Sequence, residues 1–302
     1  MRKELTPRLP DLLLLLASGI WGFAFVAQRA GMEFQGPFGF NAIRFALGAL
    51  SLIPLFRKEP LPSRRSLLFG GGLCGSALFL AASLQQVGME STSAGRGGFL
   101  TGLYILFVPL FSLLVTKRKE KASIPAVLLA LLGLYLLVGG DIRGGFNRGD
   151  ILIFVSSLFW AVHILLVDRF SRLFPPLKLA VLQYSLCSVL SLASSLLFEK
   201  RLFPSSPQGW VPLLYGGFLS IGVAYTLQIV AQKRTPPSHA ALILSLESPF
   251  ALLGGWLILG ESMGVRGLLG CALMLAAMVI SSLKSGEPGE SPRERVEITD
   301  QR

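Results

Sequence analysis

The chain alternates between apolar blocks of about 20 residues and short polar breaks. A helix that rises 1.5 Å per residue needs roughly 20 apolar residues to cross a ~30 Å hydrocarbon layer. Backbone groups in lipid need internal hydrogen-bond partners, and the alternating strands of a closed barrel are absent from the sequence. The expected fold class is therefore an all-α polytopic membrane protein. Its ten predicted transmembrane helices are residues 11–30, 38–56, 66–87, 94–116, 124–140, 151–167, 176–198, 210–231, 240–260 and 265–283.

The blocks also form a repeat. Leu84-Gln85-Gln86-Val87 and Leu227-Gln228-Ile229-Val230 lie 143 positions apart, and each precedes a polar break and another apolar block. The first and sixth blocks match at an offset of 139, and the fourth and ninth match near 145. An odd number of spans per copy makes the second copy enter from the opposite face. We predict two inverted five-helix repeats, 11–140 and 149–283, and a disordered cytoplasmic tail, 284–302.

The positions of the basic residues predict the orientation. The net charge is +11, and 20 of the 28 Lys and Arg residues fall in segments that are cytoplasmic if the N-terminus is cytoplasmic, against five in outer loops. Lys and Arg favour the cytoplasmic side, so an N-in/C-in topology is expected. Because these charges lie in short loops and form no basic stripe, no nucleic-acid partner is expected. The first block resembles a signal peptide, but its length and its match to the sixth block favour a retained span.

The sequence lacks the motifs of soluble enzymes. Cys74, Cys187 and Cys271 each lie inside an apolar block and have neither a disulfide framework nor metal-ligand spacing. His163 and Asp168 spell an H-x4-D pattern, but five helical steps place their side chains ~140° apart. No nucleotide-binding or metalloprotease signature occurs in the sequence. We expect no enzymatic activity, no cofactor and no metal.

Several motifs resemble the signature of EamA-type carriers, which belong to the drug/metabolite transporter superfamily. In the second half they are Tyr225-Thr226-Leu227-Gln228, Pro237-Ser238-His239-Ala240-Ala241, Leu246-Glu247-Ser248-Pro249-Phe250 and Leu259-Gly260-Glu261. In the first half they are Trp21-Gly22, Arg44-Phe45, Pro109 and the run from Gly98 to Tyr104.

This resemblance implies a ten-helix fold of two inverted repeats around a central cavity, lined chiefly by spans one, three, four, six, eight and nine. It also implies transport of small metabolites, often amino acids, by alternating access. The chain departs from internal symmetry at one motif. Glu247-Ser248-Pro249 has no counterpart in the first half, where Gly102-Leu103-Tyr104 occupies the aligned place.

Three charged residues within or beside the spans are candidates for the substrate cavity, and each has two interpretations. Glu247 would lie roughly 10 Å inside the ninth span, as a proton or substrate-amine site or as a structural acid beside a helix broken at Pro249. Arg44, about 9 Å deep, would bind a substrate carboxylate or pair with neighbouring carbonyls. Arg96 opens the fourth span among glycines and would contact an anion or anchor the helix.

Neutral polar and aromatic residues deep in the spans are the other candidates. Amides and phenols there would hydrogen-bond a zwitterionic substrate or hold helices together. Mid-span tryptophans would pack in a cavity or gate, and a histidine would be a protonatable group or a packed one. These candidates are Trp21, Gln85, Gln86, Tyr104, Trp160, His163, Tyr225 and Gln228.

The predicted function is a secondary transporter that moves small metabolites, amino acids or related solutes, across the bacterial cytoplasmic (inner) membrane. The expected partners are a small-molecule substrate and the lipid bilayer, with proton coupling as an option. The alternatives are a non-transporting membrane scaffold or sensor and a carrier of nucleotide- or sugar-type substrates. An intramembrane enzyme would need an acid, base or metal cluster that the spacing does not supply. Substrate identity, direction, coupling ion and oligomeric state stay open.

Overall fold

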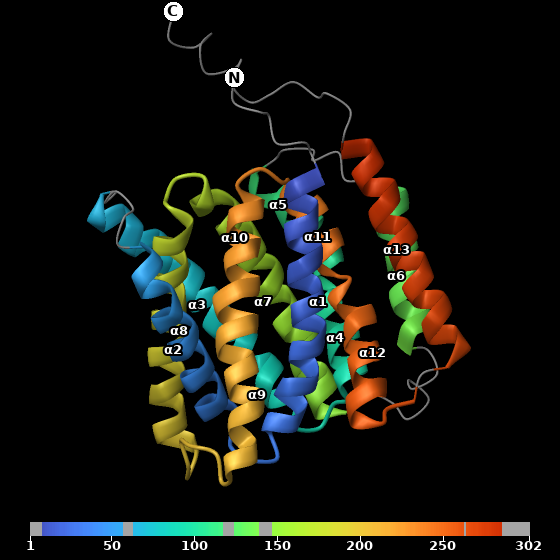
Figure 1. Cartoon of the computed structure of the whole chain (residues 1–302). Coiled ribbons are helices and arrows are strands. Elements are labelled where there is room, and N and C mark those ends of the chain that lie inside the picture. Colours follow the sequence, from blue (N-terminus) through green and yellow to red (C-terminus); the bar gives the residue numbers. More distant parts are fainter. Residues whose placement is uncertain (1–7, 57–62, 117–123, 139–146, 263, 286–302) are drawn as a thin grey trace, which may run out of the picture.

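The computed structural model describes residues 8–56, 63–116, 124–138, 147–262 and 264–285, and these form a bundle of helices (Figure 1). In chain order the helices are α1 (Arg8–Gly31), α2 (Pro37–Phe56), α3 (Arg64–Gly88), α4 (Ala94–Gly102), α5 (Tyr104–Thr116), α6 (Ile124–Val138), α7 (Arg148–Ser171), α8 (Pro176–Phe198), η2 (Pro207–Gly209), α9 (Trp210–Leu214), η3 (Tyr215–Tyr225), α10 (Thr226–Gln232), α11 (Pro237–Leu244), α12 (Glu247–Leu259) and α13 (Val265–Ser285).

Among the described residues, eight helical segments are long and apolar enough to cross a membrane. They coincide with eight of the predicted spans. Shorter apolar helices, Ile124–Leu136 and Val265–Ile280, lie where the fifth and tenth spans are predicted. The prediction of an all-helical, multi-pass membrane protein is thus confirmed. The predicted tail starts at residue 284, but α13 continues to Ser285, and residues 286–302 lie outside the described part of the chain.

The distribution of side chains is that of a protein in lipid. Large apolar side chains cover the outside of the bundle, among them Leu114, Leu197 and Phe198. Polar side chains lie inside, among them Arg44 and Glu247. Apolar side chains can face hydrocarbon without a desolvation penalty, whereas buried polar groups need hydrogen-bond partners within the protein.

Two of the spans are interrupted near their middle. The fourth span changes from α4 to α5 at Leu103, and the ninth changes from α11 to α12 at Ser245 and Leu246. Pro249 explains the second interruption, because it has no N–H for the carbonyl of Ser245, which accepts from Ser248 N at 3.1 Å. The first residues after the two interruptions, Tyr104 and Glu247, are 143 positions apart, and so are the starts of α4 and α11. The match near 145 expected from the sequence is therefore corrected to 143.

Helices from the two halves of the chain pack against each other. α2 lies against α8, α3 against α7, and α1 against α12 and η3. α4 contacts α12, and α6 pairs with α13 at one edge of the bundle (Figure 1). η3 is a π-helix that carries the middle of the eighth span, and such irregular turns are frequent at functional sites. The central region between the two halves is bordered by α1, α3, α4, α5, α7, η3, α10, α11 and α12.

At one end of the bundle, carboxylates from the connecting segments accept hydrogen bonds from the first backbone N–H groups of neighbouring helices. Glu199 accepts from the backbone N–H of Phe38 and Gly39 at 2.7 and 2.8 Å. Glu261 accepts from Ala94 N and Gly95 N at 2.8 and 3.1 Å. A carboxylate at a helix N-terminus pairs with otherwise unbonded N–H groups and with the positive end of the helix dipole.

The close approach of α1 and α12 depends on Gly22, and we expect Gly22→Ala to destabilise the fold. A Cβ at this position would lie 2.8 Å from both Ala251 N and Glu247 O, which are backbone atoms that cannot rotate away. Such overpacking costs typically 1–3 kcal/mol. Thermal unfolding in detergent should show a lower Tm than the parent. Gly72→Ala is the control, because a Cβ there meets nothing within 4 Å; an equal drop in both variants would contradict the explanation.

Glu90, in the connection between α3 and α4, gives a prediction for pH. Partial burial and, secondly, the nearby Glu199 carboxylate raise the pKa of Glu90 above its ordinary value of 4.5. The folded protein then holds this proton more tightly than the unfolded chain, so stability is lost as pH rises above 4.5. Glu90→Gln should raise Tm at neutral pH and leave it unchanged at about pH 3, where the carboxyl is protonated in both states. A gain of the same size at both pH values would contradict this reasoning.

Candidate functional site

A central cavity lies where the two halves of the chain meet. Its volume is about 30 Å³, so in this arrangement it has room for only about one or two water molecules. The lining comes from the six spans expected from the family resemblance and, through Arg44, from the second span as well. The lining residues are Trp21, Phe25, Gln28, Arg44, Gln85, Thr101, Tyr104, Trp160, Ile164, Ser220, Tyr225, Gln228, Leu244 and Glu247.

Gln85 is the centre of hydrogen bonding in this cavity. Its Oε1 accepts from Trp160 Nε1 at 2.6 Å and from Thr101 Oγ1 at 3.4 Å. Its Nε2 donates to Gln28 Oε1 at 2.9 Å. One side chain of α3 thus joins α1, α4 and α7, and it fixes the orientation of a tryptophan from the opposite half of the chain.

An aromatic cluster around Tyr225 forms one wall. The ring of Trp21 lies 4.5 Å from that of Tyr225, and the ring of Trp160 lies 6.0 Å from it on another side. Trp21 Nε1 donates to the carbonyl of Ser220 in η3 at 3.2 Å. The two tryptophans that correspond in the sequence repeat therefore both lie next to one tyrosine at the cavity wall.

Arg44 is the basic residue of the lining. Its Nε donates to Asn41 Oδ1 at 2.9 Å, and Asn41 Nδ2 donates to the carbonyl of Ala82 at 3.1 Å. The guanidinium carbon lies 5.4 and 5.2 Å from the ring centres of Phe40 and Phe45. Such contacts stabilise a cation where water is scarce. Arg44 is 2% exposed and forms no ion pair within the part of the chain that the structure describes.

Glu247 is the acidic residue of the lining and the first residue of α12. Its carboxyl group interacts with the neighbouring Tyr104 hydroxyl. Gln228 Oε1, in the same lining, is buried without a hydrogen-bond partner among the described residues. Buried polar atoms are nearly always paired in folded proteins. A carboxyl group, a hydroxyl and an unpaired amide oxygen in one lining make this cavity a candidate place for a polar ligand.

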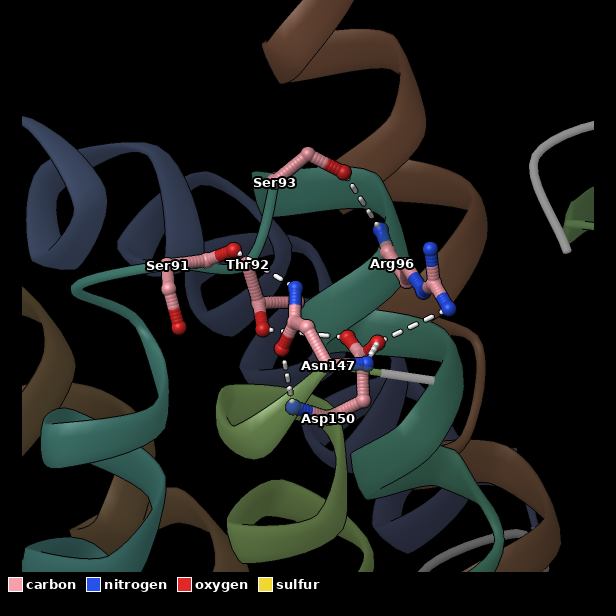
Figure 2. A network of polar contacts seen from close by, with 6 residues as sticks. All are labelled: Ser91, Thr92, Ser93, Arg96, Asn147 and Asp150. Atoms are coloured by element: carbon pink, nitrogen blue, oxygen red, sulfur yellow. Dashed lines mark hydrogen bonds and ion pairs between the residues drawn. The ribbon is translucent and has the colours of Figure 1, made fainter. Parts of the chain in front are cut away.

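The remaining sequence candidates lie outside the lining. Gln86 donates to the carbonyl of Gln28 at 3.2 Å, and His163 Nε2 lies 2.8 Å from Gln183 Oε1. Arg96 forms an ion pair with Asp150 at 2.8 Å, within a polar network at the start of α4 and α7 (Figure 2). These three contacts join helices in the present arrangement. The other eight candidates, Trp21, Arg44, Gln85, Tyr104, Trp160, Tyr225, Gln228 and Glu247, surround the one cavity.

Sequence reasoning missed several lining residues. Gln28 and Thr101 are polar residues within apolar blocks, which is the signal that could have identified them. Ser220 contributes its backbone carbonyl, and no pattern of residue types predicts that contact. Over the described ranges, no group of three or more His, Cys, Asp or Glu residues is placed to hold a metal ion.

Comparison with known proteins identifies the class. The model of the EamA-like transporter family matches residues 8–139 and again residues 147–283. The chain therefore belongs to the EamA-like transporter family, within the drug/metabolite transporter superfamily. The family and the relatives named below are transporters rather than enzymes.

The relatives extend over nearly the whole chain. An uncharacterized transporter of Archaeoglobus fulgidus is 34% identical, covering 91% of this chain and 86% of the relative. The threonine/homoserine exporter RhtA of Salmonella typhimurium is 30% identical, covering 91% and 92%. A crystal structure with 19% identity superimposes with a TM-score of 0.75, over 91% of this chain and 96% of that one, which supports the fold alone.

The hydrogen bonds of Gln85 predict the effect of Gln85→Leu. The substitution leaves the buried Trp160 N–H without its acceptor, which costs about 1–3 kcal/mol. A lower Tm in detergent and a change in tryptophan fluorescence are expected. Gln208→Leu, at an exposed position, is the matched control and should leave both unchanged. Equal Tm values for the parent and Gln85→Leu would show that this bond does not support the cavity.

Proposed function

We propose that this protein is a secondary transporter that exports amino acids or related small organic solutes across the cytoplasmic membrane of a bacterium. Substrate would bind in the central cavity, which would open to the two sides of the membrane in turn. The relatives named as threonine/homoserine exporters favour amino acids and the export direction. The bacterial sources of these relatives favour the bacterial inner membrane.

The observation that carries the proposal is the presence of one basic and one acidic side chain in the same lining. Arg44 and Glu247 are 2% and 4% exposed, and each lines the cavity without an ion-pair partner among the described residues. A buried basic or acidic group without an ion-pair partner is costly, and a zwitterion would provide a carboxylate for the guanidinium and an ammonium for the carboxyl group of Glu247. Neutral amides and aromatic rings between them suit the rest of a small organic molecule.

This lining favours a zwitterion over a nucleotide or another phosphate compound. Arg44 is the one Lys or Arg in the described lining. A phosphate group carries more charge and is usually held by several cationic or N–H donors. Glu247 in the same cavity would repel such a ligand.

The two-repeat architecture is part of the proposal. The packing of α3 on α7 corresponds, with the two repeats exchanged, to the packing of η3 on α1. In the same way, the packing of α12 on α1 corresponds to the packing of α4 and α5 on α7. The pairs α2 with α8, α4 with α12 and α6 with α13 each join corresponding helices. This exchange of partners supports two five-helix repeats, 11–140 and 149–283, in inverted orientation. The distribution of Lys and Arg supports the N-in/C-in topology, although many of these residues lie outside the described ranges.

Transport by purified protein in liposomes tests the function. We expect counterflow of at least one amino acid from a panel of the twenty, with threonine and homoserine included. Arg44→Lys keeps the charge but loses the planar fork, and Glu247→Gln removes the negative charge. Each should weaken transport about 10- to 100-fold, as expected for a lost charge-assisted hydrogen bond of ~1.5–3 kcal/mol.

Arg172→Gln is the control, because the exposed Arg172, directly after α7, pairs with Asp168 four residues earlier, and neither residue lines the cavity. It should transport like the parent. Absence of flux for every substrate, with folded parent protein in the liposomes, would contradict the proposed function. Unchanged flux in both cavity variants would contradict the assigned substrate contacts.

A further inference from the structure

Two acid–base contacts join the starts of helices at opposite ends of the bundle. Arg96 in α4 pairs with Asp150 in α7, with Nη2 and Oδ2 separated by 2.8 Å. His239 in α11 contacts Asp11 in α1, with Nε2 and Oδ1 separated by 3.1 Å. Neither pair lines the central cavity. Each pair links one half of the chain to the other.

The two contacts occupy corresponding places in the repeat. Asp11 and Asp150 are 139 positions apart, which is the offset that relates Trp21 to Trp160. Arg96 and His239 are 143 positions apart, and each is the third residue of its helix. Both helices, α4 and α11, lead directly into the mid-span interruptions of the fourth and ninth spans. The same contact is thus built twice.

The contacts lie on opposite sides of the cavity along α1. Asp11 is in the first turn of α1. The other end of α1 contacts the end of α3, because Gln86 of α3 donates to the carbonyl of Gln28 in α1. The chain continues from this end of α3 to the start of α4, where Arg96 lies. The 17 residues from Asp11 to Gln28 correspond to about 26 Å of helix, which is close to the thickness of the hydrocarbon layer.

Asp150 makes the first contact part of a network (Figure 2). Besides Arg96, its carboxylate accepts from Thr92 Oγ1 at 3.1 Å and from Asn147 N at 2.8 Å. Asn147 Nδ2 donates to the carbonyl of Ser91 at 2.9 Å. The connection between α3 and α4 is therefore fastened to the start of α7 by side chains and by backbone.

Close packing accompanies the network. A Cβ at Gly149 would overlap Ser91 Oγ and the carbonyl of Gly88. Asp150 is fully buried, and the Arg96 side chain is 10% exposed. Separating α4 from α7 at this end would have to break all of these contacts together.

The second contact is more open to water. The Asp11 side chain is 26% exposed and that of His239 is 7% exposed. Hydration weakens an acid–base contact, because water replaces the lost partner when the contact breaks. The His239–Asp11 contact itself is thus weaker than the buried Arg96–Asp150 pair.

We propose that Arg96–Asp150 and His239–Asp11 are the outer and inner gate contacts of this transporter, so that breaking one opens the cavity to that side. The inference rests on the proposed transport function. The interruptions after α4 and α11 are the hinges that let each half-helix move away from α7 or α1. Both contacts are formed in this structure, as expected of an arrangement between the two open forms. All four residues position helices and do not touch substrate.

Thiol labelling from each side of the membrane tests the gates without substrate. Cys74, Cys187 and Cys271 are replaced by Ala, and Ser220→Cys provides a reporter in the cavity wall. Right-side-out and inside-out vesicles are treated with a membrane-impermeant thiol reagent. Asp150→Asn should raise the labelling rate from the outside about fivefold or more, and Asp11→Asn should do so from the cytoplasmic side, since ~1 kcal/mol changes a minor population by that factor.

Arg172→Gln again serves as the control, because its ion pair with Asp168 is local to the end of α7 and does not join the two halves of the chain. Thr92→Val removes one bond to Asp150 and should act in the same direction as Asp150→Asn, so the test holds even if the latter variant does not fold. Rates equal to the parent, or faster labelling from the same side in both aspartate variants, would overturn the proposal. The labelling assay does not depend on transport. A failure of the flux assay would therefore contradict the proposed function, whereas the labelling rates alone decide whether these contacts are gates.

Discussion

A polar group in the middle of a bilayer has no water to bond with, so its partners must come from the protein or from a ligand. The interior of this bundle follows that constraint. Gln85 bonds with Gln28, Thr101 and Trp160, and Arg44 is held by Asn41 between two phenylalanine rings. Gln228 Oε1, unpaired among the described residues, and the neighbouring side chains of Tyr104 and Glu247 line the cavity, and these groups are then the ones available to a solute.

The interrupted helices connect this chamber to the ends of the bundle. Tyr104 and Glu247 each stand at the first residue after an interruption, facing the cavity, and the half-helices before them carry Arg96 and His239. A movement at one end of α4 or α11 would therefore shift the residues that line the binding space. This geometry couples the proposed gates to the proposed substrate contacts through short, stiff segments.

The sequence predicted the features that depend on local composition. Apolar block length located the helices, and isolated polar residues such as Gln85 and Glu247 within those blocks marked the cavity. The partners of these residues were not predictable, because they come from distant parts of the chain. Arg96 was a candidate anion contact in the sequence, and only the fold brings it to Asp150. The offset of 143 likewise emerges from helix starts, which a sequence match near 145 had misplaced.

The central claim is that two five-helix repeats pass through the membrane in opposite orientation around one polar chamber. Its most direct test compares the connections after Gln85 and after Gln228, by single cysteines at Ser91 and Lys233 in a cysteine-free protein, treated with an impermeant thiol reagent. If the repeats are inverted, Ser91→Cys reacts only from outside and Lys233→Cys only from the cytoplasm. Reaction of both from the same compartment would contradict it.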